Sequence, residues 1–153
     1  VEPLRKAILI DKKPYLGICL GMHLLATRGH EFGTNEGLDI IPAEVRKFNF
    51  SDNSLKVPHM GWNNISLKKD HELLNYLKKD KDFYFVHSYN FIPTSDECII
   101  STCDYGGEFV AAIAKDNIIG LQFHPEKSQR NGINFLELFI EWTPSLKQEV
   151  PHA

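Results

Sequence analysis

One stretch near the start of the chain, residues 14–25, constrains the fold more than any other part of the sequence. Its apolar run at 15–18 predicts a short buried strand, and the residues after position 19 follow a helical pattern. Cys19 stands between the two, with Gly17 and Gly21 two residues away on either side. This Gly-x-Cys-x-Gly spacing is typical of a nucleophile elbow, a tight strand-to-helix turn that holds a reactive side chain clear of a sheet. The stretch therefore predicts a cysteine nucleophile at a strand end.

The expected position of Cys19 also bears on its chemistry. At a helix N-terminus, unpaired backbone N–H groups favour thiolate over thiol, and the Leu20 amide can donate to a developing oxyanion. The alternative is a structural cysteine, because free cysteine is among the most buried residue types. The motif by itself leaves both interpretations open.

Composition and charge exclude several kinds of partner. The 153 residues carry a formal net charge of -3, and lysines and arginines occur only in scattered pairs, so we expect neither nucleic acid nor an anionic membrane as a ligand. No apolar run approaches the length of a membrane span. The cysteine count is 3, and no Cys/His cluster has metal-ligand spacing, which favours a reducing cytoplasm over a disulfide or zinc framework. We expect a cytoplasmic protein without metal or cofactor.

Periodicity in the rest of the chain predicts strands and helices in one domain at 1–143, followed by a polar tail at 144–153. Helical spacing of apolar residues occurs at 4–10, 22–27, 71–77 and 135–142, and Asn131 is a candidate cap for the last helix. Strand-like runs occur at 38–48, 57–65, 83–87, 98–101, 109–114 and 118–123. Pro42 suggests that the first of these runs is an outer strand, and Asp116 and Asn117 form the turn before the last one.

A second group of reactive residues follows the last predicted strand. A cysteine nucleophile needs a base that accepts the thiol proton and later returns it to the leaving group, and imidazole does so near neutral pH. His124 and Glu126 are two residues apart on an extended segment, so their side chains project to the same side. A carboxylate on one ring nitrogen fixes the tautomer of the imidazole. The alternative for His124 is a structural histidine at a strand end.

These motifs together resemble the class I (triad) glutamine amidotransferases. Within that family the chain is similar to the glutaminase subunits of imidazole glycerol phosphate synthase, which act in histidine biosynthesis. The similarity extends from about residue 14 to residue 142 in ordered blocks, namely Gly17-Ile18-Cys19-Leu20-Gly21-Met22, Val57-Pro58-His59-Met60-Gly61-Trp62-Asn63, Phe85-Val86-His87-Ser88-Tyr89 and Gln122-Phe123-His124-Pro125-Glu126-Lys127-Ser128. The resemblance implies an α/β fold built on an open mixed, mainly parallel sheet flanked by helices.

The resemblance also implies roles for individual residues. Cys19 would attack the side-chain amide of glutamine and form a glutamyl thioester, His124 would protonate the departing ammonia and then activate water, and Glu126 would orient His124. The substrate would be bound by Leu20, His23, Glu31, Ser88 and Tyr89. For Glu31 the alternative is a solvated loop carboxylate, and for Ser88 and Tyr89 it is an ordinary place in a strand.

A partner follows from the same resemblance. His59, Met60, Trp62, Tyr84 and Lys127 match the face that meets a cyclase, a (β/α)8 barrel, to which ammonia is passed within a heterodimer. For Trp62 the alternative is core packing, because a large aromatic side chain is usually buried. No phosphate-binding glycine loop is present in the sequence, so the ribonucleotide substrate is expected to bind the partner.

Two departures from the family pattern carry further expectations. His23 stands where the family usually has glutamine, so we expect weaker, pH-dependent glutamine binding. The family's first strand and its Pro-Gly-x-Gly oxyanion loop have no counterpart before Val1, so we expect an N-terminally truncated, poorly active chain. Two other functions stay open, namely an ammonia donor to another synthetase, such as a sugar-modifying enzyme, and an inactive docking module. A papain-like protease is disfavoured by the strand-turn context of the cysteine.

Overall fold

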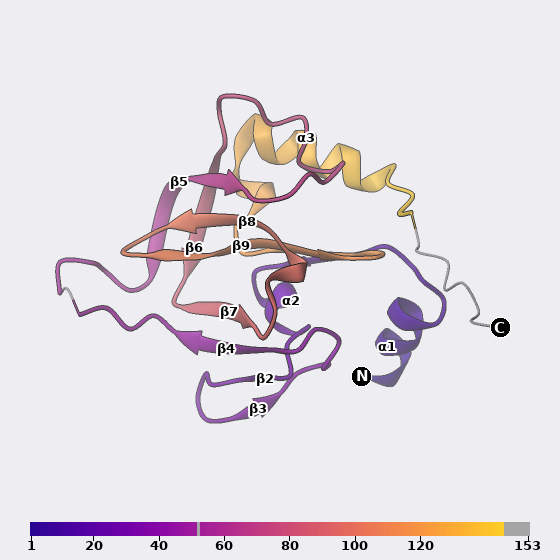
Figure 1. The fold of residues 1–153 in the computed structure, drawn as a ribbon, viewed down its shortest axis with the longest axis horizontal. Coiled ribbons are helices and arrows are strands. Elements are labelled where there is room, and N and C mark those ends of the chain that lie inside the picture. Colours follow the sequence, from indigo (N-terminus) through magenta and orange to yellow (C-terminus); the bar gives the residue numbers. More distant parts are fainter. Residues whose placement is uncertain (52, 146–153) are drawn as a thin grey trace.

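The computed structural model describes residues 1–51 and 53–145 of the chain, and it is organised around a six-stranded sheet (Figure 1). The strand order in this main sheet is β1-β10-β9-β8-β5-β6. Its strands are β1 (Tyr15–Ile18), β5 (His59–Leu67), β6 (Asp82–His87), β8 (Ile99–Asp104), β9 (Glu108–Lys115) and β10 (Ile118–Leu121). Most of the polar tail expected at 144–153 lies outside the described residues.

A smaller four-stranded sheet lies beside the main one, with the order β3-β2-β4-β7. Its strands are β2 (Arg28–Gly29), β3 (Asn35–Glu36), β4 (Ala43–Lys47) and β7 (Tyr89–Pro93). β4 is flanked by β2 and β7, so the expectation of an outer strand here is wrong. The interior position is compatible with Pro42 because the proline precedes the strand and removes no bond from its ladder.

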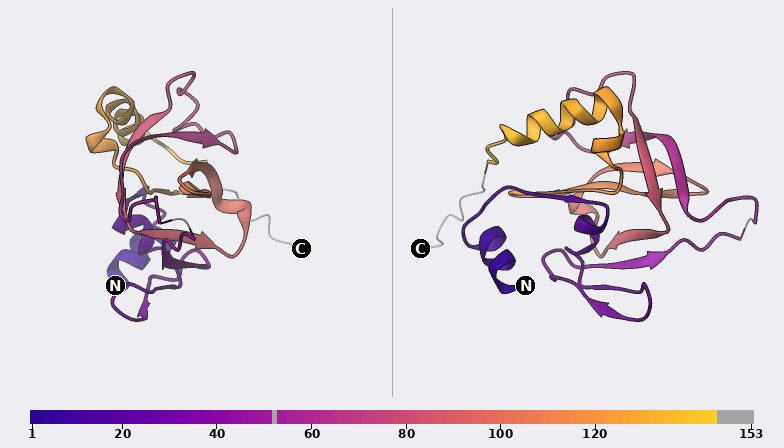
Figure 2. Two further views of the ribbon diagram at one scale, coloured as in Figure 1. Left: turned by 90° about the vertical axis from the view of Figure 1, so that its left-hand side faces the viewer. Right: turned by 180° about the vertical axis from the view of Figure 1, so that it is seen from behind.

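Helices cover both faces of the main sheet (Figures 1 and 2). α3 (Gln129–Ile140) lies on one face, whereas α1 (Glu2–Leu9), α2 (Leu20–His23) and the smaller sheet lie on the other. Two single 3-10 turns complete the described elements, η1 (Asp96–Cys98) and η2 (Pro125–Lys127). No described helix has the length and apolar character needed to cross a membrane.

The strand pairing confirms the mixed α/β fold, but the expectation that the sheet is mainly parallel is wrong. Within the main sheet only β1 and β10 pair in parallel, and the pairs β10–β9, β9–β8, β8–β5 and β5–β6 are antiparallel. A parallel neighbour needs a long crossover, whereas the turn at Asp116 and Asn117 returns the chain within two residues. Short turns therefore make most of this sheet antiparallel.

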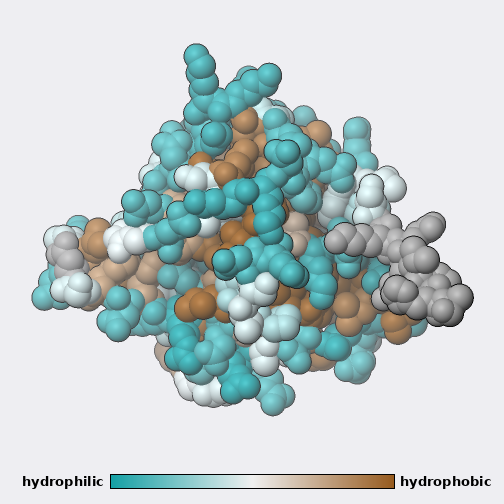
Figure 3. All heavy atoms as spheres, viewed as in Figure 1, coloured by the Kyte–Doolittle hydropathy of each residue, from teal (hydrophilic) through white to brown (hydrophobic). Residues whose placement is uncertain are grey.

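A hydrophobic core fills the space on each side of the main sheet. The core beneath α3 is dominated by aromatic side chains with no exposed surface, including Phe83, Phe85, Phe123 and Phe135. The core on the other side joins α1, α2 and the smaller sheet through Ile8, Met22, Leu25, Phe91 and Ile113. Hydrophilic side chains project over a partly apolar centre on the face seen in Figure 3. Because both faces of the main sheet are packed, its central strands are fixed in position.

Two helices expected from periodicity differ in the structure. The helix expected at 22–27 ends at His23, because the carbonyl groups of Leu24 and Leu25 accept hydrogen bonds from Leu38 and Ile40 instead of continuing a helix. The helix expected at 71–77 is a series of turns. Its apolar positions are nevertheless buried as the pattern required, at Leu73, Leu74 and Leu77.

The other predicted elements are confirmed, with one change at a helix start. The opening helix, the strand at 15–18, the later strands and the closing helix all form. Asn131, however, lies inside α3, whose N-cap position is taken by Ser128, so Asn131 is not the cap. Its side chain donates instead to the carbonyl of Asp82, at 3.2 Å, which joins α3 to the start of β6.

A buried asparagine fixes α1 against the rest of the fold. Asn117, in the turn between β9 and β10, is 2% exposed. Its side-chain amide donates to the carbonyl of Ile8 at 2.9 Å and to that of Lys13 at 2.7 Å. Its own carbonyl accepts from the Tyr15 N–H at 2.9 Å, where β1 begins. One side chain thus joins α1, the start of β1 and the β9–β10 turn.

Candidate active site

The turn between β1 and α2 holds Cys19 in a backbone conformation that side chains rarely adopt. Its φ is 51° and its ψ is -100°, which confirms the strained turn predicted from the glycine spacing. Gly17 permits this turn, because a Cβ at that position would lie 2.5 Å from the backbone oxygen of Gly21. The Cys19 N–H donates to the carbonyl of Leu121 at 2.7 Å, so the nucleophile stands beside the end of β10.

The segment after β10 carries His124 and Glu126. The Nδ1 atom of His124 lies 2.5 Å from Oε1 of Glu126. The backbone of His124 is held on both sides, because its N–H donates to the carbonyl of Tyr84 and its carbonyl accepts from the Ser128 hydroxyl at 2.6 Å. The Ser128 hydroxyl also accepts from the Tyr84 N–H at 3.0 Å. The imidazole is therefore oriented by a carboxylate and anchored to β6.

These two groups meet at the same end of the main sheet. The Cys19 sulfur lies 4.0 Å from the carbonyl oxygen of Val86, near the end of β6, the strand to which His124 is also anchored. The Glu126 carboxylate is close enough to raise the pKa of the Cys19 thiol. The positions required by the proposed Cys-His-Glu constellation are therefore brought together from segments more than a hundred residues apart in the chain.

The ionisation of Cys19 differs from the expectation. Burial is the main cause that raises the pKa of the Cys19 thiol, and the carboxylates of Glu126 and Glu31 raise it further. Hydrogen bonds from the Leu20 backbone N–H and from Gln122 lower it without reversing the direction. The expectation that the helix N-terminus favours the thiolate is wrong, because α2 is only four residues long and two carboxylates face the sulfur. Cys19 at rest is a thiol that needs a base.

Gln122 contacts the nucleophile, and sequence reasoning assigned it no role. Its side-chain nitrogen lies 3.6 Å from the Cys19 sulfur, and its side-chain oxygen lies 2.8 Å from Nε2 of His23. Gln122 is fully buried. Its place two residues before His124 in the same motif was the available signal. Burial is also the main cause that lowers the pKa of His23, and the Gln122 contact and the Glu31 carboxylate oppose that shift.

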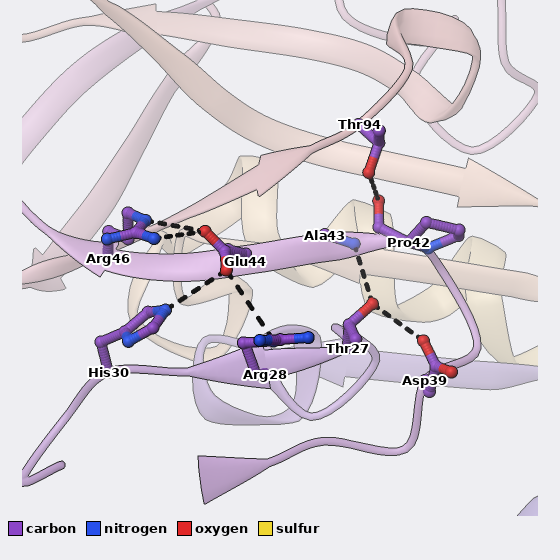
Figure 4. Close-up of polar contacts among 9 residues, drawn as sticks. All are labelled: Thr27, Arg28, His30, Asp39, Pro42, Ala43, Glu44, Arg46 and Thr94. Atoms are coloured by element: carbon purple, nitrogen blue, oxygen red, sulfur yellow. Dashed lines mark hydrogen bonds and ion pairs between the residues drawn. The ribbon is translucent and has the colours of Figure 1, made fainter. Parts of the chain in front are cut away.

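Glu31 belongs to a loop that is tied to β4 by a cluster of charges (Figure 4). Glu44 lies at the centre of this cluster, 2.6 Å from Arg46, 3.5 Å from His30 and 3.8 Å from Arg28. The Arg46 hydrogen bond is the main cause that holds the pKa of the Glu44 carboxyl below its usual range. Because His30 directly precedes Glu31, this cluster fixes the base of the loop whose carboxylate acts on Cys19 and His23.

A line of hydrogen bonds runs from β5 to the start of β7 through two buried histidines. The Nδ1 atom of His87 lies 3.0 Å from the carbonyl oxygen of Tyr89, which can only accept, so this nitrogen carries a proton. The Nε2 atom of His87 is then an acceptor for Nδ1 of His59, at 3.0 Å. The remaining nitrogen of His59 accepts from the Asn63 side chain at 3.4 Å. Burial lowers the pKa of His59 to about 4 and that of His87 to about 3.

This line of hydrogen bonds fixes the segment that carries Ser88 and Tyr89, which the resemblance assigns to the substrate pocket. The Ser88 carbonyl accepts from the Phe48 N–H at 3.0 Å, and the Tyr89 carbonyl is held by His87. The preceding residue, Val86, is the one whose carbonyl faces the Cys19 sulfur. The segment therefore borders the nucleophile and is held by backbone contacts on both sides.

Four of the residues assigned to a partner face lie together on the surface. Met60 is 63% exposed and Trp62 is 47% exposed, so core packing of Trp62 is excluded. The Trp62 and Tyr84 rings are 6.1 Å apart, and the Lys127 amine lies 6.0 Å from the centre of the Tyr84 ring. His59 departs from the expectation, because at 3% exposure its side chain is not on this surface. Alternation along β5 turns His59 inward, where its ring stacks on Tyr105 and Phe85.

Other features of the described residues give no competing site. A cavity of about 700 Å³ borders Asp116 and Lys115, at the end of β10 opposite to Cys19. Across residues 1–51 and 53–145, no group of three or more His, Cys, Asp or Glu side chains is arranged to hold a metal ion. Cys98 and Cys103 are both buried, and neither forms a disulfide. Cys19 is the most accessible of the chain's cysteines.

The strained cysteine turn, the His-Glu pair and the mixed sheet define a class of protein, and comparison with known families gives the same answer. The family model for glutamine amidotransferase class-I matches residues 2–142. The chain therefore belongs to the class I glutamine amidotransferase family.

Curated relatives are more specific. The chain is 47% identical over 145 residues to a protein of Zymomonas mobilis named imidazole glycerol phosphate synthase subunit HisH, covering 94% of the chain and 66% of that relative. It is 43% identical over 153 residues to subunit HisH 2 of Vibrio vulnificus, covering 100% of the chain and 71% of the relative. It is 48% identical over 140 residues to subunit HisH 1 of Campylobacter jejuni, covering 92% and 69%. The chain thus spans about two thirds of the length of these relatives.

Solved structures agree on the fold. A glutamine amidotransferase of Thermotoga maritima superposes with a TM-score of 0.59 at 21% identity, covering 91% of this chain and 52% of that one. A protein of Thermoplasma acidophilum described as a component of GMP synthase superposes with a TM-score of 0.57 at 23% identity, covering 86% and 59%. These likenesses confirm the α/β fold of the family.

Proposed function

We propose that this chain hydrolyses glutamine to glutamate and ammonia through Cys19, His124 and Glu126. The observation that carries the proposal is the strained turn that presents Cys19 beside the His124–Glu126 pair at one end of the main sheet. The family supports the same reaction class. Cys19 is the nucleophile, and the backbone N–H of Leu20, which already donates toward the sulfur, is a donor for the oxyanion.

The hydrogen bond between His124 and Glu126 sets the direction of proton transfer. Because a carboxylate accepts, Nδ1 of His124 carries the proton and Nε2 is free to take the proton of the Cys19 thiol. As sulfur bonds to the amide carbon of glutamine, the C–N bond breaks and Nε2 returns the proton to the leaving ammonia. Water activated by the same nitrogen then cleaves the thioester and releases glutamate.

We extend the proposal to the substrate pocket and to the pathway. Glu31 binds the amino group of glutamine, and His23, Ser88 and Tyr89 border the substrate, with Ser88 and Tyr89 contributing backbone groups. Because the curated relatives are named as subunits of imidazole glycerol phosphate synthase, we propose that the ammonia serves that synthase in histidine biosynthesis. The exposed face of Met60, Trp62, Tyr84 and Lys127 is the docking face for the partner, a cyclase with a (β/α)8 barrel.

The reaction is tested by trapping the nucleophile. A glutamine-analogue electrophile, 6-diazo-5-oxo-norleucine, is expected to label Cys19 and to leave Cys103 unlabelled, as read by mass spectrometry of the digested protein. Cys19→Ala is expected to abolish both labelling and glutamate release, whereas Cys103→Ser retains both because Cys103 is buried in the core away from the site. Labelling confined to other residues, or glutamate release by Cys19→Ala, would refute the assignment.

The docking face is tested separately. Trp62→Ala removes the largest exposed aromatic surface of that face and is expected to weaken binding of the cyclase at least tenfold in a co-purification assay, since buried tryptophans are common binding hot spots. Ile133→Ala is the matched control, because Ile133 is also an exposed apolar residue but lies on α3. Equal loss of binding in the two variants would contradict the proposal for this face.

A further inference from the structure

Gln122 forms a bridge between the nucleophile and His23. The residue follows β10, and its backbone N–H donates to the Ala111 carbonyl at 2.8 Å, so its position is fixed by the sheet. Its buried side-chain amide has a partner at each end, the Cys19 sulfur at 3.6 Å and His23 Nε2 at 2.8 Å. A buried amide with both ends paired is held in one orientation by its partners.

The orientation of this amide determines where protons lie. An amide nitrogen donates and an amide oxygen accepts, so the nitrogen that faces the sulfur donates to it, and Nε2 of His23 must carry the proton received by the oxygen. If His23 Nε2 had no proton, the amide would have to turn by 180° to donate to it. The amide oxygen would then face the sulfur, where it could accept from a thiol but would repel a thiolate.

From this geometry we infer that Gln122 is a positioning residue that stabilises the Cys19 thiolate, and that the Nε2 proton of His23 fixes the orientation in which it does so. The inference deepens the proposed glutaminase function and rests on it. In the reaction the thiol proton goes to His124, and the sulfur left behind keeps its hydrogen bond from the Gln122 amide. No proton passes through the amide, and no bond of Gln122 is formed or broken.

Other charged groups around this bridge set its limits. The carboxylates of Glu31 and Glu126 face Cys19 and oppose the thiolate, while Glu31 also favours protonated His23. From β6, His87 lies within electrostatic range of both His23 and His124, but burial keeps its pKa at about 3, so it stays neutral near neutral pH. Among these neighbours, the Leu20 N–H and the Gln122 amide are the hydrogen-bond donors that favour the thiolate. Removing Gln122 therefore leaves the sulfur with a backbone donor against two carboxylates.

The experiment measures the ionisation of Cys19 without using glutamine. The rate of Cys19 alkylation by iodoacetamide is followed from about pH 6 to about pH 10 by mass spectrometry, since only the thiolate reacts. Gln122→Met keeps a side chain of similar length without the amide, and it is expected to shift the alkylation profile of Cys19 upward by roughly one to two pH units, the effect of losing a hydrogen bond to a charged group. An unshifted profile would overturn the role of Gln122.

Variants of His23 test the second half of the inference. His23→Leu has no donor and is expected to shift the profile upward, whereas His23→Gln has an amide that can donate to Gln122 and is expected to keep the profile near that of the unchanged protein. His71→Gln makes the same substitution at a turn outside the site and controls for loss of a histidine. If His23→Gln and His23→Leu shift the profile equally, a donor at position 23 is not what orients Gln122.

A measurement on the unchanged protein covers the case in which buried variants fail to fold. Nitrogen-15 NMR of the histidine side chains is expected to find a proton on Nε2 of His23 across the pH range in which Cys19 becomes a thiolate. An unprotonated Nε2 in that range would overturn the inference. Both measurements are independent of turnover, so a protein that shows the predicted profiles yet releases no glutamate refutes the proposed function and leaves the Gln122 bridge standing.

Discussion

The buried pair of His59 and His87 makes the stability of this protein depend steeply on pH. Each ring is held neutral because its two nitrogens are used once as donor and once as acceptor, in the line from Asn63 to Tyr89. A second proton on either ring would leave a buried cation that points its new N–H group at another donor. Folding therefore keeps both histidines unprotonated.

The sign and size of the effect follow from the two pKa values. Burial lowers the pKa of His59 to about 4 and of His87 to about 3, whereas the unfolded chain has the ordinary value of about 6.5. Between these values the unfolded chain binds more protons, so the free energy of unfolding is largest above about pH 6.5 and falls as the pH is lowered. The slope is about 1.4 kcal/mol per pH unit for each histidine. From about pH 6.5 to about pH 4.5, His87 alone removes about 3 kcal/mol and the pair about 5 kcal/mol, as upper values.

A loss of this size is a large part of the 5 to 15 kcal/mol that stabilises an ordinary domain. The assay is urea unfolding at a series of pH values, read by tryptophan fluorescence. His59→Asn keeps a donor toward His87 but does not titrate, so the slope of unfolding free energy against pH is expected to fall by about one histidine's share. Asn117→Ala is the control, because it lowers stability without removing a titrating group and should keep the slope unchanged. A flat free energy between about pH 6.5 and about pH 4.5 in the unchanged protein would refute this reasoning.

Two further predictions concern the positions that hold β1 and its turn. Asn117→Ala is expected to lower the free energy of unfolding by about 1 to 3 kcal/mol, because the carbonyls of Ile8 and Lys13 lose their donor; urea unfolding at neutral pH measures the loss, and an unchanged midpoint would contradict it. Gly17→Ala is expected to cost about 1 to 3 kcal/mol or prevent folding, because the new Cβ would meet the Gly21 backbone at 2.5 Å. Gly21→Ala is its matched control, since that Cβ would make only an ordinary contact at 3.6 Å, and comparable thermal midpoints for the two variants would disprove the packing argument.

Local sequence patterns determined the elements that carry the reactive groups. The glycines around Cys19 predicted a strained turn, and the structure has φ of 51° at that residue, because backbone sterics act within a few neighbouring residues. The spacing of His124 and Glu126 predicted their pairing for the same reason, and their atoms lie 2.5 Å apart. The apolar residues at 73, 74 and 77 were correctly expected to be buried, although the helix that should have carried them is a series of turns.

Properties that depend on distant segments required the tertiary structure. The sulfur of Cys19 is more often a thiol than the helix terminus suggested, since Glu126 and Glu31 come from other parts of the chain and burial adds to their effect. The inward position of His59 and its tautomer depend on partners on β6 and β7.

The balance between parallel and antiparallel pairing was likewise outside the reach of local patterns, because periodicity identifies a strand and not its neighbour. The bridge from His23 through Gln122 to Cys19 joins residues about a hundred positions apart. By itself the sequence determined which side chains react and where each short segment bends. Only the folded arrangement decided which of them share a proton, because hydrogen bonds and desolvation depend on the atoms that packing brings within a few ångströms.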